Sequence, residues 1–256
     1  MNLKVYDFKG KTAFITGGSS GIGAATSIAF ANCGANVAIV DTNESLGLEL
    51  VKKLEAQDKK AIFIKCDTSK ASEVEAAVKT TVQKFGSLDF AFNNAGIEGL
   101  PAPTADCTEE NFDRIIAVNL KGVWLCMKNQ IPQMLKQGQG SIVNCSSIAG
   151  IVGFQGSPGY VASKHGVLGL TKTAALECAR QNIRVNAVCP GVIQTPMIDR
   201  FTKGDQKVLS YFATSEPIGR VGQPDEIAGA VLWLCSDQST FVTGHTLTVD
   251  GGWVAQ

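Results

Sequence analysis

The chain has 256 residues, and its 23 Lys and Arg balance 23 Asp and Glu, so the formal net charge is zero. This balance argues against binding to nucleic acid or to an anionic membrane surface, which both need an excess of basic side chains. The hydrophobic content of 45% is ordinary for a globular protein and too high for a disordered one.

The chain shows no targeting, membrane or metal signal. The longest apolar stretch, residues 227–235, has about half the length of a membrane span, and the first residues carry charges where a signal peptide is apolar. We therefore expect a cytoplasmic protein. Its eight cysteines form no C-x-x-C pair. An even count would permit disulfides, but in the cytoplasm small, buried, reduced side chains are the better interpretation. Neither His165 nor His245 has metal-ligand spacing with a cysteine, so no metal site is predicted.

Short runs rich in β-branched and aromatic residues alternate with longer runs whose apolar residues have helical spacing. The predicted strands are residues 12–16, 36–40, 61–65, 88–93, 141–145, 184–189 and 246–249. Nearly continuous apolar strands separated by helices indicate a parallel sheet that is covered on both faces. Right-handed crossovers then give an α/β fold, a Rossmann-like doubly wound sheet of seven strands in one domain over residues 1–256.

The first strand runs into Thr16-Gly17-Gly18-Ser19-Ser20-Gly21-Ile22-Gly23, and a helical pattern follows. Glycines in a tight strand-to-helix turn let backbone N–H groups approach a pyrophosphate at the positive end of the helix. The spacing is G-x-x-x-G-x-G and not the G-x-G-x-x-G of other dinucleotide folds. In this strand–turn–helix context the motif predicts a dinucleotide site.

The second strand ends at Asp41, about twenty residues beyond the glycines. Its carboxylate can accept hydrogen bonds from the adenosine ribose and would repel a 2′-phosphate, which predicts NAD as the cofactor. The alternative is that Asp41 caps the next helix. Asn43 suits that capping position better, which leaves Asp41 free.

Two further polar features follow in chain order. Asn93-Asn94-Ala95-Gly96 comes directly after the fourth strand, where loop residues at the carboxyl edge of the sheet can touch a cofactor. Asn119 interrupts the helical pattern of residues 112–134, where a polar side chain costs helix stability. Asn119 either faces solvent or opens the helix locally for a purpose.

The fifth strand ends at Ser146-Ser147, Tyr160 comes thirteen residues after Ser147, and Lys164 comes four residues later. Residues four apart share one helix face, so an ammonium would lie beside the phenol and stabilise its phenolate. Such a pair supplies a proton donor and acceptor. With Ser147 upstream and Pro190-Gly191 after the next strand, a chance occurrence is improbable.

Residues 193–217 contain no predicted strand and only weak helical periodicity, with Met197, Phe201 and Tyr211 among polar residues. The segment is either a surface helical insertion or a mobile lid over a binding site, and its place after Pro190-Gly191 favours the lid. We expect the substrate pocket to be walled by residues 97–101, residues 148–155 and this lid.

Together these motifs resemble the short-chain dehydrogenase/reductase family over essentially the whole chain. The residues that carry the resemblance are Thr16-Gly17-x-x-x-Gly21-Ile22-Gly23, Asp67, Asn93-Asn94-Ala95-Gly96, Asn119, Ser147, Tyr160-x-x-x-Lys164, Pro190-Gly191 with Thr195, and Asp250-Gly251-Gly252. The family implies hydride transfer between NAD and a small secondary alcohol or ketone in a homotetramer. Family dehydrogenases of cyclic diols, cyclic ketones and sugars look most similar.

The resemblance also implies a role for each matched residue. Tyr160 is the catalytic acid/base, and Lys164 is its partner and holds the nicotinamide ribose. Ser147 positions the substrate oxygen, and Asn119 supports the proton relay. Asp67 faces the adenine, while Ile193 and Thr195 fix the carboxamide. The other expected cofactor contacts are Gly17, Ser20, Gly21, Ile22, Gly23, Asp41, Thr68, Asn94, Ala95, Gly96, Pro190 and Gly191.

Two alternative functions stay open on the sequence. A β-ketoacyl carrier-protein reductase resembles this chain closely, but such enzymes usually carry Arg where this sequence has Ser20, and they prefer NADPH, which Asp41 opposes. A non-catalytic NAD-sensing regulator or scaffold typically lacks the Tyr or the Lys, and both Tyr160 and Lys164 are present.

Two apolar features favour an oligomer. The helical segments 119–135 and 168–179 carry more apolar residues than one face against a sheet requires, which is typical of subunit interfaces. The C-terminal Trp253-Val254-Ala255 is too apolar for a free tail, so we expect it to pack against a neighbouring subunit.

Overall fold

The computed structural model describes residues 6–256, apart from the side chains of residues 206 and 209. Within these residues seven parallel strands form one sheet in the order β3-β2-β1-β4-β5-β6-β7. The strands are β1 (Thr12–Thr16), β2 (Asn36–Asp41), β3 (Ala61–Lys65), β4 (Phe90–Asn93), β5 (Gly140–Cys145), β6 (Ile183–Pro190) and β7 (Thr246–Val249). The predicted doubly wound sheet is confirmed, and no strand end differs from its prediction by more than two residues.

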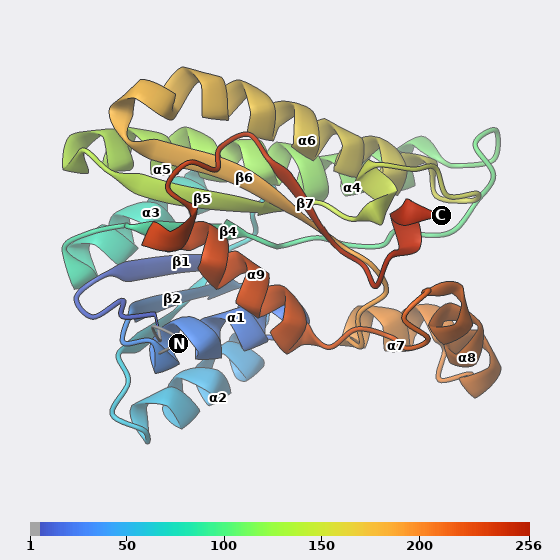
Figure 1. Ribbon diagram of the computed structural model, residues 1–256, viewed down its shortest axis with the longest axis horizontal. Helices are drawn as coiled ribbons and strands as arrows, with labels where there is room; N and C mark the ends of the chain where they lie inside the picture. Colours follow the sequence, from blue (N-terminus) through green and yellow to red (C-terminus); the bar gives the residue numbers. More distant parts are fainter. Residues whose placement is uncertain (1–5) are drawn as a thin grey trace.

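Helices cover both faces of the sheet (Figure 1). One face carries α1 (Gly21–Asn32), α2 (Glu44–Glu55) and α9 (Pro224–Cys235), and the other carries α3 (Ala71–Phe85), α5 (Gly122–Gln137) and α6 (Pro158–Cys178). Each face has its own apolar core. Because side chains alternate along a strand, Ile39 of β2 belongs to the first core and its neighbours Ala38 and Val40 belong to the second.

The predicted helical run over residues 112–134 is built from three joined segments. α4 (Glu109–Ile116) passes into a π-helical stretch, Ala117–Lys121, which continues directly into α5. Short 3-10 turns lie at Ile148–Gly150, Ala179–Gln181, Asp237–Ser239 and Trp253–Ala255. Of the helices described, none is both long and apolar enough to cross a membrane.

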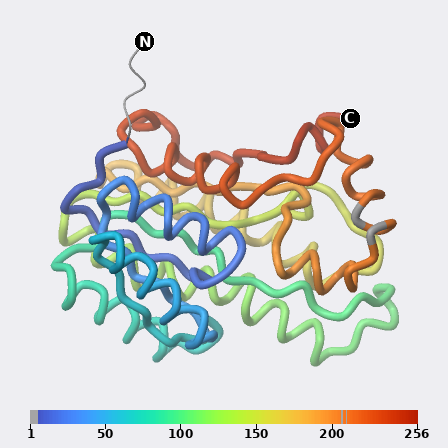
Figure 2. Tube along the Cα trace, turned by 90° about the horizontal axis from the view of Figure 1, so that it is seen from below, coloured from blue at the N-terminus to red at the C-terminus, as the bar shows by residue number. Residues whose placement is uncertain are grey.

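Residues 193–217 are helical. They form α7 (Pro196–Thr202) and α8 (Gln206–Ser215), which lie beyond the carboxyl ends of the strands and near the C-terminus (Figures 1 and 2). We call α7 and α8 the lid arm. The segment is thus a helical insertion at the edge where a lid would act, and the motion of a lid stays a prediction.

The carboxyl edge of the sheet has a natural crevice between β1 and β4. β1 lies between β2 and β4, so the strand order reverses at this point, and the loops after β1 and β4 turn to opposite faces. The glycine-rich loop follows β1, and Asn93-Asn94-Ala95-Gly96 begins at the end of β4. The topology therefore brings both predicted loops to one crevice.

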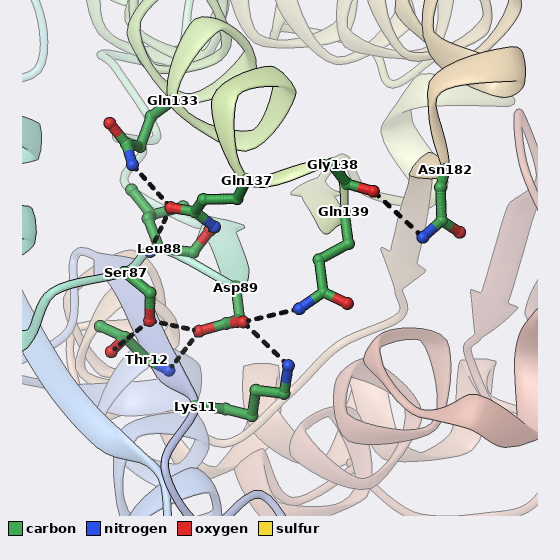
Figure 3. A network of polar contacts seen from close by, with 10 residues as sticks. All are labelled: Lys11, Thr12, Ser87, Leu88, Asp89, Gln133, Gln137, Gly138, Gln139 and Asn182. Atoms are coloured by element: carbon green, nitrogen blue, oxygen red, sulfur yellow. Dashed lines mark hydrogen bonds and ion pairs between the residues drawn. The ribbon is translucent and has the colours of Figure 1, made fainter.

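At the opposite, amino edge of the sheet, the buried carboxylate of Asp89 connects residues at the starts of several strands (Figure 3). It accepts hydrogen bonds from the hydroxyl of Ser87 at 2.6 Å, the N–H of Thr12 at 2.9 Å and the Lys11 ammonium at 3.1 Å. The Gln139 side-chain amide reaches the same carboxylate at 3.4 Å. One side chain thus ties the starts of β1, β4 and β5 together.

Replacing Asp89 by Ala should lower the free energy of unfolding by about 2–4 kcal/mol, because the buried N–H of Thr12 and the half-buried hydroxyl of Ser87 lose their acceptor. Urea unfolding followed by circular dichroism measures this change. The exposed Glu55 at the end of α2 offers a control, since Glu55→Ala should change stability by less than about 0.5 kcal/mol. Equal losses in the two variants would contradict the structural role of Asp89.

Candidate active site

The glycine-rich loop, residues 17–23, forms a cradle at the crevice. Gly17 and Gly21 have φ angles of +60° and +51°, which residues with a side chain rarely adopt. A Cβ on Gly23 would lie 2.0 Å from the carbonyl oxygen of Gly17, so no side chain can stand between loop and helix. α1 starts here without a side-chain cap and without an acidic residue in its first turn. Its first N–H groups are therefore available to an anion.

Asn94 and Thr16 fix the shape of this loop. The Asn94 side-chain nitrogen donates to the carbonyls of Thr16 at 3.1 Å and Gly17 at 3.2 Å. The Thr16 hydroxyl accepts from the N–H groups of Asn94 and Ala95 at 2.9 and 3.0 Å. The expected contact residue Asn94 thus joins the loop after β4 to the loop after β1.

Asp41 also binds the glycine-rich loop. Its Oδ2 accepts from the hydroxyl and the N–H of Ser19 at 2.6 and 3.1 Å, and its Oδ1 accepts from the N–H of Asn43 at 3.0 Å. The Asn43 side chain caps α2 by accepting from Leu46, so the interpretation of Asp41 as the helix cap is wrong. Ser19 was not singled out from the sequence, and its place inside the glycine motif was its only signal.

The π-helical stretch positions Asn119, which is fully buried, so the interpretation that it faces solvent is wrong. Its Oδ1 accepts from the N–H of Ile97 at 2.8 Å, and its Nδ2 donates to the Ile97 carbonyl at 2.9 Å. Gly96 permits this approach, because a Cβ there would lie 3.3 Å from Asn119 Oδ1 and 3.6 Å from Lys164 Nζ. The local widening of the helix thus serves to hold the loop after β4.

Tyr160 and Lys164 lie on α6, with Lys164 Nζ 5.5 Å from the centroid of the Tyr160 ring. Lys164 is 4% exposed, and its ammonium donates to the carbonyl of Cys145 at 2.8 Å. The ion pairs found within residues 6–256 do not include Lys164. An ammonium has three donors, so this one retains capacity to stabilise negative charge beside the phenol.

The two serines after β5 have different surroundings. The hydroxyl of Ser146 is buried and donates to the carbonyl of Lys164 at 2.8 Å, which fixes α6 against the sheet. Ser147 is half-buried, and its Oγ accepts from the N–H of Ala149 at 3.1 Å. The hydroxyl hydrogen of Ser147 is left to donate to a ligand, as the expected role of Ser147 requires.

Asp67 and Thr68 follow β3. Asp67 Oδ1 accepts from the hydroxyl and the N–H of Ser69 at 2.7 and 3.0 Å. Burial raises the pKa of the Asp67 carboxyl, but these bonds and the Lys70 ammonium outweigh burial and hold the pKa below its ordinary value. Thr68 is buried against the end of the π-helical stretch, where a Cβ on Gly122 would lie 3.0 Å from Thr68 Oγ1. The loop after β3, where the adenine is expected, is therefore held in a fixed shape.

The segment after β6 crosses the glycine-rich loop. A Cβ on Gly21 would lie 3.2 Å from Cγ2 of Thr195, so this residue packs directly against the cradle. Ile193 is buried and forms an isolated bridge with Gly222. A Cβ on Gly191 would lie 2.8 Å from the Cα of Asp250. A glycine at position 191 therefore lets this segment approach the C-terminal Asp250-Gly251-Gly252 motif closely.

The expected residues thus lie along the carboxyl ends of β1 to β6. The crevice has a cradle without side chains, a helix N-terminus open to an anion, and an ammonium with donors to spare. These features fit a dinucleotide with its pyrophosphate at the glycine-rich loop and its reactive ring towards Lys164. Within the described part of the chain, no group of three or more His, Cys, Asp or Glu could hold a metal ion.

Comparison with known proteins identifies the family. A family model described as enoyl-(acyl carrier protein) reductase matches residues 17–254. The chain is 44% identical over 250 residues to the 2,5-dichloro-2,5-cyclohexadiene-1,4-diol dehydrogenase of Sphingobium indicum, covering 97% of this chain and 99% of that relative. It is 43% identical over 247 residues to the 3-oxoacyl-[acyl-carrier-protein] reductase of Thermotoga maritima, covering 96% and 98%. The crystal structure of levodione reductase is 39% identical and superposes with a TM-score of 0.93, covering 97% of this chain and 99% of that chain. The chain belongs to the short-chain dehydrogenase/reductase family.

In this short-chain dehydrogenase/reductase the lid arm is held to the opposite wall of the crevice by one ion pair. Arg200 of α7 donates to both carboxylate oxygens of Glu98, at 2.9 and 3.2 Å. Burial raises the pKa of Glu98, but the Arg200 guanidinium, a backbone N–H and Arg114 together outweigh burial and hold the pKa below its ordinary value. Glu98 follows Ile97, whose peptide Asn119 holds, so the ion pair connects the lid arm to the fixed loop.

The C-terminal aromatic residue has a partner within its own chain. The Trp253 ring stacks on Phe154 with 5.2 Å between the ring centroids. Phe154 belongs to the loop expected to wall the pocket, so the C-terminus supports that loop. Trp253 thus has an aromatic partner within its own chain, and packing of the C-terminal residues against a neighbouring subunit stays a prediction.

The cysteines offer no competing nucleophile. All eight are unpaired, and six of them are buried. Cys145 and Cys189 lie at the carboxyl ends of β5 and β6. Burial raises the pKa of the Cys145 thiol, which the Lys164 ammonium offsets in part, and it raises the pKa of Cys189 to about 11. Both side chains are therefore neutral thiols near pH 7.

Proposed function

We propose that this protein is an NAD-dependent dehydrogenase that reversibly oxidises a secondary alcohol on a small ring, with Tyr160 as the acid/base. The observation that carries the proposal is the buried ammonium of Lys164 beside the Tyr160 ring, at a crevice lined by a glycine-rich cradle. A non-catalytic NAD sensor would have no use for this arrangement.

Oxidation of a secondary alcohol removes a proton from the hydroxyl oxygen and a hydride from the carbon that carries this hydroxyl. The Tyr160 phenolate takes the proton, and the Lys164 ammonium stabilises the phenolate charge. The Ser147 hydroxyl donates to the substrate oxygen and orients it. The nicotinamide cofactor, when bound, supplies the hydride acceptor. Asn119 contributes by holding the loop at Ile97 against the site.

The substrate class is supported by the residues at the mouth of the crevice. Large exposed apolar side chains gather on the three expected pocket walls: Leu100, Ile151, Phe154, Phe201 and Tyr211. Exposed apolar residues of this kind suit a ligand with an apolar body. The name of the Sphingobium relative refers to a cyclohexadiene diol, which is a six-membered ring with two hydroxyl groups. We therefore favour a cyclic alcohol or cyclic diol over a sugar.

A β-ketoacyl carrier-protein reductase is the second candidate, because the Thermotoga maritima relative is 43% identical. Two assays separate the candidates. Oxidation of cyclohexanol or a cyclic diol with NAD, followed by nicotinamide absorbance, tests the first. Reduction of an acetoacetyl carrier-protein thioester tests the second. We expect kcat/KM for the ring alcohol to exceed that for the thioester.

Tyr160→Phe should lower kcat by about 10²–10⁴-fold, because the ring stays in place and only the oxygen that carries the proton is lost. Cofactor affinity should change little, and calorimetric titration with NADH provides that control. Activity within tenfold of the wild type would contradict the assignment of Tyr160 as the acid/base.

The wild type should favour NAD over NADP by about tenfold or more in kcat/KM. Asp41 would face the 2′-phosphate, and each pair of unit charges at about 4 Å repels by roughly 4 kcal/mol before relaxation and screening. The double variant Asp41→Ala, Thr42→Arg should shrink or reverse the preference. Because Asp41 also holds Ser19, Ser19→Ala is the matched control, and it should weaken NAD and NADP alike. Equal use of NAD and NADP by the wild type would refute this role of Asp41.

We also propose a homotetramer, supported by exposed apolar side chains on two long helices. Trp124 and Leu135 of α5 and Leu176 of α6 are exposed, Leu176 at 84%. Light scattering at micromolar concentration should give about four times the 27.0 kDa chain mass. Leu176→Glu should lower that mass, whereas Leu48→Glu, an exposed leucine on α2, should not. A monomeric wild type would contradict the proposal.

A further inference from the structure

Glu216, the residue directly after α8, places a buried carboxyl group at the base of the lid arm. It is 3% exposed. Its Oε1 accepts from the N–H of Val192 at 2.8 Å, and among the described residues its Oε2 has no hydrogen-bond partner. Burying a polar atom without a partner costs free energy, so a purely structural position would favour an apolar side chain.

The chain makes room for this carboxyl group. A Cβ on Gly191 would lie 2.8 Å from Glu216 Oε1, and a Cβ on Gly251 would lie 3.3 Å from Oε2. The group borders a cavity of about 60 Å³ whose other walls include Ile193, Ile218 and Val249. That volume is large enough for ordered water to bind Oε2.

Among the described residues, Glu216 forms no ion pair with a cation. The Asp250 carboxylate at the end of β7 accepts from the N–H groups of Gly252 and Val254, both at 3.0 Å. Arg220 lines the same cavity but is paired with Glu226 at 2.7 and 2.8 Å. Burial raises the pKa of Glu216, the Val192 N–H lowers it in part, and Asp250 raises it further. Gln is a close substitute for this side chain, because its amide oxygen can accept from the Val192 N–H.

Four hydrogen bonds of backbone groups hold residues 191–194, which cross the glycine-rich loop, and the bond from the Val192 N–H to Glu216 is one of them. The Gly191 N–H donates to the Val249 carbonyl at 3.1 Å, the Val192 carbonyl accepts from Gly222 at 2.9 Å, and the Gln194 N–H donates to the Gly222 carbonyl at 2.9 Å. β7 holds one of these backbone groups, and Gly222, in the loop before α9, holds two more. Glu216 holds the fourth, and it is the connection that comes from the end of the lid arm.

We propose that Glu216 is a positioning residue that sets the segment 191–195 for the nicotinamide end of the dinucleotide. The inference rests on the proposed function, since it requires a nicotinamide dinucleotide in this crevice. The adenine end is lined by other elements, namely the glycine-rich loop, Asp41 and the loop after β3. Loss of the Val192 bond should therefore weaken the hold on one end of the cofactor and leave the other unchanged.

Two variants and two ligands test this role by calorimetric titration. Glu216→Met keeps the side-chain volume but removes the acceptor, and Glu216→Gln keeps an oxygen for the Val192 N–H. NADH carries both ends of the cofactor, whereas ADP-ribose lacks the nicotinamide. We expect Glu216→Met to raise the dissociation constant of NADH by about five- to tenfold, as for the loss of one hydrogen bond whose donor is left unpaired. The dissociation constant of ADP-ribose should change by less than about twofold, and Glu216→Gln should bind NADH within about twofold of the wild type.

Glu226→Met is the matched control, because it removes a second carboxylate of the same cavity, one that does not bind the Val192 N–H. It should leave both dissociation constants unchanged. Equal weakening of NADH and ADP-ribose in Glu216→Met would overturn the positioning role, and so would a Glu216→Gln variant as weak as Glu216→Met. A wild type that binds neither ligand would instead overturn the proposed function, and the positioning role with it.

Discussion

The buried ammonium of Lys164 is the constraint around which the active site is arranged. Burying a cation costs free energy unless its N–H donors have acceptors and its charge has a partner. Here the ammonium donates to a single peptide carbonyl, that of Cys145 in β5, at 2.8 Å. α6 brings Tyr160 beside the ammonium, and Gly96, which has no side chain, lets the loop after β4 approach it. The ion pairs of the described residues do not include Lys164. Negative charge on the Tyr160 oxygen or on a bound ligand would therefore complement its ammonium.

Most polar residues of the site act on neighbouring loops before any ligand arrives. Asp41 holds Ser19, Asn94 holds Gly17, and Asn119 holds the peptide of Ile97. These bonds explain how loops with few apolar contacts keep a defined shape at the edge of the sheet, which preorganised binding requires. The Asp89 network at the amino edge serves the fold alone, so stability and binding are assigned to opposite ends of the same strands.

The sheet could be predicted from the sequence because each strand is a short, nearly continuous apolar run that ends in glycine or polar residues. The site motifs were equally local. Asn119 was ambiguous, since a polar residue in a helical pattern is consistent with either solvent or a π-helical turn, and only its burial distinguishes them. Ser19, Glu216 and the stacking of Trp253 on Phe154 depend on contacts between distant segments, and no local pattern announces them.

Glu216 shows why such residues escape sequence reasoning. It stands in Thr214-Ser215-Glu216-Pro217, which has the polar character of an exposed turn, and it is buried only because β6, β7 and α8 converge on it. Lys164 is the complementary case, a charged residue on a helix whose other buried positions are small or apolar. Both polar side chains oppose the local rules of burial, and two apolar cores, one on each face of the sheet, supply the stability that makes this possible. The ammonium of Lys164 faces a peptide carbonyl, and Oε1 of Glu216 faces a peptide N–H, so each buried group fixes the backbone at the site and keeps capacity for a further hydrogen bond.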